Sequence, residues 1–213
     1  KGEGLLKDAH TVSVDGTEYH AKFIVLATGQ RSHVLDIEGK ELMHNSTDFM
    51  ELDTFPERIT FLGGGYISIE FASIAAKMGS EVSVIGHSDT VLKQYHQPYV
   101  QKLVKKLEDE GVTFHLNIDV NKLEQTEDGL KFTDDKGFEL YTDYVVDATG
   151  RVPNVEGIGL EQVGVDYDKH GIKVNKFMQT SVPNIYASGD VVSKKTPKLT
   201  PTATFESNYI ALN

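Results

Sequence analysis

A glycine-rich turn between a predicted strand and a predicted helix constrains this fold more than any other feature of the sequence. Residues 58–62 are typical of a short strand, glycines occupy positions 63–65, and apolar residues then recur at helical spacing. Gly63 permits a tight turn, Gly65 lets a pyrophosphate approach the backbone, and the small Ser68 lets the helix pack closely on the strand. The N-terminus of such a helix attracts anions. The pattern predicts a dinucleotide-binding strand–helix–strand unit.

The following segments continue the alternation of strands and helices. Residues 81–85 and 112–116 are typical of further strands, and an amphipathic helix between them begins near Pro98 and ends before Gly111. The stretch from about 118 to 140 is polar, hairpin-like and rich in turn residues, so it predicts a β-rich insert. Together these segments predict an α/β fold with a doubly wound parallel sheet and right-handed crossovers.

Two stretches of the chain match one another. Phe23–Gly29 and Tyr144–Gly150 are both apolar runs ending in Ala-Thr-Gly, and their final glycines lie 121 positions apart. Gly16 and Gly137 share that offset. In each copy a hairpin with a glycine turn precedes a buried strand. The two coincident offsets predict duplication of one supersecondary unit.

The end of the second strand bears on which dinucleotide binds. NAD sites usually place Asp or Glu there, about 20 residues after the first glycine, to hold the ribose hydroxyls. This sequence has Gly86 at that place, His87 next, and Lys93 a few residues on. His87 and Lys93 could receive a 2′-phosphate; the alternatives are that both are solvated loop residues and that Asp89 holds the ribose. We expect NADP(H) in preference to NAD(H).

Composition argues against several other classes of protein. The chain of 213 residues carries 21 basic and 32 acidic side chains, and this net charge of −11 argues against a nucleic acid or an anionic membrane surface as partner. No apolar run approaches the roughly 18 residues of a membrane span. The eight histidines lack metal-ligand spacing and there is no cysteine, so we expect no metal site and no thiol nucleophile. The cluster of Lys194, Lys195 and Lys198 is expected to be a solvated loop.

Four ordered motifs resemble the pyridine nucleotide–disulfide oxidoreductase family, in its glutathione-reductase-like branch. They cover nearly the whole chain: Ala27–Gly29, Gly63–Ala72, Ala148–Asn154, and Thr180 with Ile185–Asp190. In that family the nicotinamide domain is inserted into the FAD domain. The resemblance therefore implies a Rossmann-like NAD(P)-binding domain, with a parallel sheet and a β-meander, at residues 58–150. It assigns residues 1–57 and 151–213 to a partial FAD-binding domain.

The resemblance also implies roles for residues of the nicotinamide domain. Tyr66 resembles the aromatic lid that covers the flavin until nicotinamide displaces it, with a surface tyrosine as the alternative. Glu70 resembles the carboxylate that approaches the nicotinamide, with an exposed helix charge as the alternative. His87 and Lys93 align with two arginines of NADP-using members. This departure weakens the 2′-phosphate site, because lysine lacks the bidentate fork and histidine is mostly neutral at pH 7.

Further roles fall on the flavin side. Gly150 and Arg151 resemble the switch back towards the flavin domain, and Asp190 resembles the acid that hydrogen-bonds the FAD ribityl chain. Thr200 resembles the position at a helix start whose backbone meets the flavin pyrimidine, where a helix N-terminus favours negative charge. We expect no catalytic residue within the chain. The residues expected to bind a cofactor are Gly29, Gly63, Gly65, Tyr66, Ile67, Ser68, Glu70, His87, Lys93, Gly150, Arg151, Asp190 and Thr200.

The family's other functional parts are expected outside these 213 residues. The adenosine-binding fingerprint of the FAD domain, the redox cysteine pair and the lysine partner of Glu70 would precede Lys1. The dimerisation domain with the catalytic His–Glu pair would follow Asn213. The chain is therefore expected to be a fragment that binds nicotinamide nucleotide, holds FAD poorly and is inactive alone.

The parent protein is expected to be a cytoplasmic, homodimeric oxidoreductase that passes hydride from NADPH to FAD and onward to a disulfide or similar acceptor. One alternative is an enzyme that uses NAD(H) and resembles dihydrolipoamide dehydrogenase. Another is a flavin oxidoreductase without the cysteine pair. The third is a nucleotide-binding module without catalysis.

Overall fold

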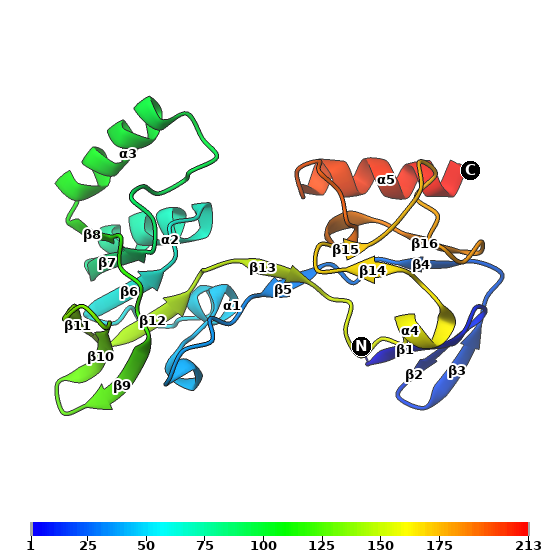
Figure 1. Ribbon diagram of the computed structural model, residues 1–213, viewed down its shortest axis with the longest axis horizontal. Helices are drawn as coiled ribbons and strands as arrows, with labels where there is room; N and C mark the ends of the chain where they lie inside the picture. Colours follow the sequence, from blue (N-terminus) through cyan, green and yellow to red (C-terminus); the bar gives the residue numbers. More distant parts are fainter. Residues whose placement is uncertain (1, 213) are drawn as a thin grey trace. The chain divides into compact units, whose positions relative to one another are not determined.

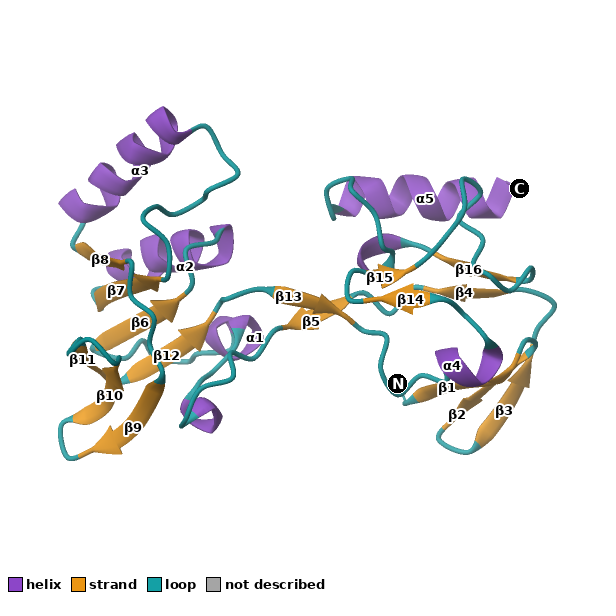
Figure 2. Cartoon of the chain, viewed as in Figure 1, coloured by secondary structure: helices purple, strands orange, loops and turns teal. Residues whose placement is uncertain are grey.

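The chain forms two compact units in the computed structural model, which describes residues 2–212 (Figure 1). Unit 1 combines the residues up to Arg31 with those from Val152 onward, and unit 2 comprises Ser32–Arg151. No helix in the described part of the chain has the length and apolar character needed to cross a membrane. Figure 2 shows the mixture of helices and strands in both units.

Unit 2 is built on a four-stranded parallel sheet with the order β12-β6-β7-β8. The strands are β6 (Arg58–Leu62), β7 (Glu81–Gly86), β8 (Val112–Leu116) and β12 (Tyr144–Asp147). Helices α2 (Tyr66–Lys77) and α3 (Gln97–Asp109) connect the first three strands. The sheet therefore grows from β6 through β7 to β8 on one side, while β12 returns to the other side of β6. This order confirms the predicted Rossmann-like α/β fold.

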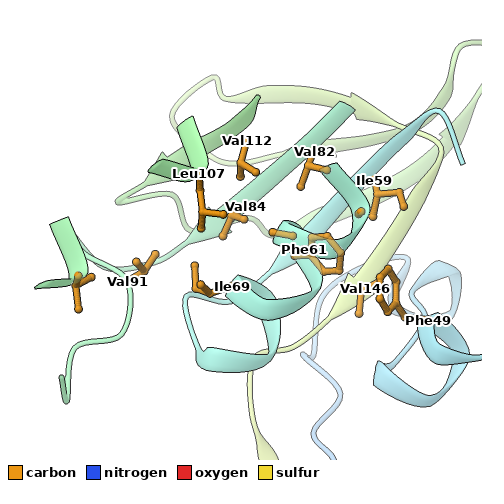
Figure 3. Close-up of a cluster of buried hydrophobic side chains, with 13 residues drawn as sticks. Phe49, Ile59, Phe61, Ile69, Val82, Val84, Val91, Leu107, Val112 and Val146 are labelled. Atoms are coloured by element: carbon orange, nitrogen blue, oxygen red, sulfur yellow. The ribbon is translucent and has the colours of Figure 1, made fainter. Parts of the chain in front are cut away.

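Alternate strand residues supply two cores, one on each face of this sheet. Phe61 and Val84 point into the core that α2 and α3 cover (Figure 3). Leu62 and Ile85, their neighbours along the strands, pack instead against Phe132 of the antiparallel insert. A side-chain period of two along each strand produces this division. The sheet is covered on both faces, which explains why residues 59–62, 82–86 and 145–147 are buried without alternation.

The insert is the three-stranded antiparallel meander that covers the second face. Its strands are β9 (Lys122–Thr126), β10 (Gly129–Thr133) and β11 (Glu139–Thr142), in the order β11-β10-β9. The prediction of a β-rich insert over about 118–140 is thereby confirmed.

Residues 32–57 pack with unit 2, although the resemblance groups them with the FAD-domain piece. The short helix α1 (Ser46–Met50) places Phe49 against Phe61 and Phe71, with ring centroids 5.4 Å and 4.3 Å apart. His44 forms a parallel bridge with Val146 of β12. These contacts extend the compact unit to a point well before residue 58. A 3-10 turn, η1 (Lys40–Leu42), precedes α1.

Unit 1 has its own core around the parallel strands β4 (Ile24–Leu26) and β16 (Ile185–Ala187). An antiparallel meander of β1 (Gly4–Asp8), β2 (Thr11–Val14) and β3 (Thr17–His20) precedes β4. Its remaining elements are α4 (Leu160–Val163), β14 (Tyr167–Asp168), β15 (Gly171–Ile172), η2 (Gly189–Val191) and α5 (Thr200–Leu212). Strands β5 (Gln30–Ser32) and β13 (Arg151–Pro153) form a two-stranded sheet.

The sequence repeat corresponds to a repeated structural pattern. In each unit a three-stranded meander precedes a strand that joins a parallel neighbour and is followed by Ala-Thr-Gly. The strand of the second copy, β12, is buried as expected, whereas β4 exposes Val25, so the expectation of a buried strand is wrong for the first copy. Gly16 and Gly137 occupy equivalent turns with φ of 84° and 92°, in the left-handed region that favours glycine. The expected hairpin is extended by a third strand in both copies, which supports duplication of the whole meander–strand unit.

Candidate functional site

Two turns leave the sheet of unit 2 side by side at the carboxyl ends of its strands. Residues 63–65 follow β6 and residues 148–150 follow β12, and the two strands are parallel neighbours. Gly63 has φ of 115°, and a β-carbon there would lie only 2.6 Å from the carbonyl oxygen of Ala148. Only glycine therefore fits at this position. Because the order of strands reverses at this edge, it is the place where doubly wound sheets bind ligands.

The N-terminus of α2 opens onto the same edge. Gly65 is the N-cap of α2, no side chain caps the helix, and its first turn holds no acidic residue. A β-carbon at Gly65 would meet nothing within 4 Å, so the backbone there is approachable. The uncompensated N–H groups and the positive end of the helix dipole suit a phosphate group.

The rest of the glycine motif ties α2 to its surroundings. Ser68 is fully buried, as expected for a small residue where helix and sheet pack closely, and Ile67 is half-buried. The backbone N–H of Leu92 donates to the carbonyl of Gly64 over 2.8 Å. The loop that follows β7 is thus anchored directly on the glycine turn.

That loop carries the residues expected to select the dinucleotide. Strand β7 ends at the buried Gly86, where no carboxylate is present. His87, Asp89 and Lys93 are all exposed in the loop, and Lys93 directly follows the anchored Leu92. The structure therefore brings the backbone of Lys93 within one residue of the contact with the glycine turn.

Tyr66 and Glu70 lie one helical turn apart on α2 and line a pocket between α2 and α3. Both side chains are exposed, and the pocket has a volume of about 430 Å³. The lining residues are Tyr66, Ile69, Glu70, Leu92, Tyr95, His96, Tyr99, Val100 and Leu103. Sequence reasoning missed the aromatic wall of Tyr95, His96 and Tyr99, although the cluster of rings just before and within α3 was a visible signal.

Two of the unit 1 residues expected to bind FAD lie at the carboxyl ends of β4 and β16. Gly29 follows β4 and Asp190 follows β16, and the two strands are parallel neighbours. Asn154 fixes the turn after β4, because its N–H donates to the carbonyl of Gly29 over 3.0 Å and its side-chain amide donates to that of Thr28 over 2.8 Å. The sequence motif Ala-Thr-Gly and the later Asn154 are thus parts of one hydrogen-bonded turn.

Helix α5 is joined to the turn that carries Asp190. Thr200 is the first residue of α5. Glu206, 7% exposed, accepts hydrogen bonds from the Gly189 backbone N–H over 2.8 Å and from the Lys194 ammonium over 2.6 Å. The structure therefore brings the Asp190 turn and α5 together.

The expectation of a solvated lysine loop is wrong for two of the three lysines. Lys194 is 10% exposed in its ion pair with Glu206, and Lys198 donates to the carbonyl of Asp190 over 2.7 Å. Burial lowers the pKa of Lys198 below its usual value. Lys195 is exposed as expected. Each of the other two is held by a specific acceptor: Lys194 by the buried Glu206, and Lys198 by the backbone carbonyl of Asp190.

Gly150 and Arg151 occupy the end of unit 2. The carbonyl of Gly150 accepts a hydrogen bond from the His33 N–H over 3.0 Å, and Arg151 is the exposed first residue of β13. In the described part of the chain, no group of three or more His, Cys, Asp or Glu side chains is arranged to hold a metal ion.

Comparison with known proteins gives the class to which this arrangement belongs. Residues 1–207 match the family model described as pyridine nucleotide-disulphide oxidoreductase, and the chain belongs to this family of flavin-dependent oxidoreductases that use pyridine nucleotides. The resemblance inferred from the four motifs is confirmed.

Individual relatives are similar over nearly the whole chain. It is 38% identical to the chloroplastic/mitochondrial glutathione reductase of Pisum sativum, over 99% of this chain and 38% of that protein. It is 33% identical to a dihydrolipoyl dehydrogenase of Bacillus subtilis, over 99% of this chain and 47% of that protein. The HOCl-induced flavoprotein disulfide reductase RclA from Escherichia coli superposes with a TM-score of 0.91 at 27% identity, covering 97% of this chain and 48% of RclA. The chain spans about half the length of these relatives or less.

Proposed function

We propose that unit 2 binds a nicotinamide dinucleotide across the switch point of its sheet, with the pyrophosphate at Gly63–Gly65. One observation carries this proposal: the glycine turn follows the strand at which the order reverses, and Gly65 borders open space at the N-terminus of α2. This arrangement supplies unpaired N–H groups and a partial positive charge where a pyrophosphate needs them.

The strand order also orients the dinucleotide. In doubly wound sheets the adenosine ribose lies at the end of the second strand, which here is β7 with the adjoining loop of His87 and Lys93. The nicotinamide half would then lie on the other side of β6, towards the turn after β12. Tyr66 and Glu70, on the first turns of α2, would border its path.

We propose that NADPH is preferred to NADH. The support is chemical: β7 ends in glycine where NAD sites carry a carboxylate, and Lys93 follows a residue hydrogen-bonded to the glycine turn. Similarity to glutathione reductases and to dihydrolipoyl dehydrogenases leaves both dinucleotides open. NADH with Asp89 as ribose ligand is therefore the competing proposal.

For the whole protein we propose hydride transfer from NADPH to FAD and onward to a disulfide or similar acceptor. When bound, the nicotinamide would supply the hydride and the flavin would receive it. In unit 1 the turn of Gly29, the turn of Asp190 and the N-terminus of α5 at Thr200 suit FAD, since a β-carbon at Gly29 would meet nothing within 4 Å and a helix N-terminus favours negative charge. A flavin oxidoreductase without a cysteine pair and a nucleotide-binding module without catalysis are the alternatives.

We expect the 213-residue chain itself to bind nicotinamide nucleotide, to retain little FAD and to show no turnover. It contains no cysteine and covers 38% of the Pisum sativum glutathione reductase and 48% of RclA. A cytoplasmic location and a homodimeric state of the whole protein are further expectations that rest on family resemblance.

A thermal unfolding comparison tests the dinucleotide proposal. NADPH is expected to raise the unfolding midpoint of the chain more than NADH at equal concentration, because a ligand stabilises by about 2.7 kcal/mol at 100 times its Kd and by less when it binds more weakly. A Lys93→Ala variant is the matched control, and it should lose part of the NADPH shift while keeping the NADH shift. A larger shift with NADH would contradict the proposed preference for NADPH. No shift with either dinucleotide would contradict the proposed binding site.

A further inference from the structure

Hydrogen bonds join the segment His33–Leu35 to the turn that follows β12, entirely within unit 2. The backbone N–H of His33 donates to the carbonyl of Gly150 over 3.0 Å, and the His33 ring nitrogen Nδ1 lies 3.0 Å from the Thr149 hydroxyl oxygen. The backbone N–H of Leu35 donates to Asp147 Oδ2 over 2.7 Å. Asp147 Oδ1 accepts from both the hydroxyl and the backbone N–H of Thr149, over 2.7 Å and 2.9 Å.

These contacts fix the direction of a three-residue hydrogen-bond chain. The Thr149 hydroxyl has a single proton, which it donates to Asp147, so His33 must donate from Nδ1–H. The chain therefore runs from His33 through Thr149 to a carboxylate that is only 4% exposed. His33 and Thr149 are half-buried and only Asp147 is buried, so the network is partly sheltered from water, which strengthens its hydrogen bonds.

The turn held by this network forms one wall of the proposed dinucleotide site. The carbonyl of Ala148 is the group that a β-carbon at Gly63 would strike at 2.6 Å, and Thr149 Cα would lie 3.1 Å from the same β-carbon. The turn lies on the β12 side of β6, opposite to β7. It therefore borders the nicotinamide half of the ligand and not the adenosine half.

We propose that His33 and Thr149 are positioning residues that hold the Ala148–Gly150 turn in the geometry that receives the nicotinamide half. The inference rests on the proposed binding of a dinucleotide at Gly63–Gly65. Neither side chain needs to touch the ligand; each acts through the backbone of the turn. Loss of either side chain should let the turn move, and it should weaken the binding of only that part of the ligand that the turn borders.

Two pairs of variants test this inference in the 213-residue chain. His33→Leu removes the donor, whereas His33→Asn keeps an N–H close to the position of Nδ1. Thr149→Val removes the hydroxyl with little change of shape, whereas Thr149→Ser keeps it. The measurements are the Kd values of NADPH and of 2′,5′-ADP, which contains only the adenosine half, together with the urea midpoint of each variant to establish that it is folded.

We expect His33→Leu and Thr149→Val to weaken the binding of NADPH about tenfold and that of 2′,5′-ADP less than about twofold. The tenfold change corresponds to about 1.4 kcal/mol, the size of one lost hydrogen bond. His33→Asn and Thr149→Ser should bind NADPH within about threefold of the unaltered chain. The double variant His33→Leu/Thr149→Val should lose no more than either single variant, because both break the same chain.

Unchanged NADPH affinity in both His33→Leu and Thr149→Val would overturn the inference. Equal losses of affinity for NADPH and for 2′,5′-ADP would also overturn the inference, since they would indicate general damage to the binding site. If the unaltered chain bound neither ligand, the proposed function would fail and this inference with it.

Discussion

Replacement of Gly65 by valine is expected to weaken NADPH binding by at least about 100-fold while leaving the fold intact. Gly65 has φ of −86° and ψ of 177°, a conformation that any residue adopts, and a β-carbon there would meet nothing within 4 Å. The added side chain would instead occupy the space beside the first N–H groups of α2. Because these groups are proposed to bind the pyrophosphate, a loss of about 2.7 kcal/mol or more of binding free energy should follow.

The matched control for this variant is Gly63→Ala, which should damage the fold itself. A methyl group at Gly63 would lie 2.6 Å from the Ala148 carbonyl oxygen, and φ there is 115°. We expect a loss of about 3 kcal/mol or more in the free energy of unfolding. Calorimetric titration with NADPH and urea unfolding separate the two effects. A Gly65→Val chain that binds NADPH as tightly as the unaltered chain would contradict the proposed site.

Removal of Glu206 is expected to destabilise unit 1 by about 3–5 kcal/mol. The Glu206 and Lys194 side chains are 9% and 10% exposed and their charged atoms lie 2.6 Å apart, so Glu206→Leu leaves a largely buried and unpaired cation. The variant also deprives the Gly189 N–H of its acceptor. Because Gly189 precedes Asp190, the loss should loosen the turn proposed to bind FAD.

The double variant Glu206→Leu/Lys194→Met distinguishes charge burial from the packing of α5. Replacing a buried ion pair by apolar residues of similar size is often neutral, so the double variant should regain most of the lost stability. Urea unfolding of the single and double variants measures both effects. If Glu206→Leu alone costs less than about 0.5 kcal/mol, or if the double variant is no more stable than the single one, the ion pair is not the stabilising interaction that we infer.

Sequence patterns were sufficient for the elements whose signals are local. The strand at 58–62 and the helix after the glycine turn follow from apolar periodicity. The turn itself follows from the need for glycine at position 63, where φ is positive. The repeated Ala-Thr-Gly turns were also visible, because matching residues lie at one constant offset. These elements depend on residues that are close together in the sequence, so short sequence patterns predict them.

Contacts between residues that are distant in the sequence could not be predicted in this way. No sequence pattern around Phe49 indicated that this residue would pack on Phe61 and Phe71. Lys194 resembled a solvated lysine because its partner, Glu206, lies 12 residues further along the chain. His33 and Thr149 are separated by 116 residues. Pairings of this kind depend on tertiary structure, which no short pattern encodes.

The central claim is that the glycine turn at the switch point of unit 2 binds a nicotinamide dinucleotide. Its most direct test is a titration of the ¹⁵N-labelled chain with NADPH, followed through the chemical shifts of the backbone amides. We predict saturable changes that are largest at residues 64–68, 87–93 and 148–150, with the β1–β3 meander unaffected. Saturable changes that are largest in unit 1, or no saturable changes at all, would contradict the claim.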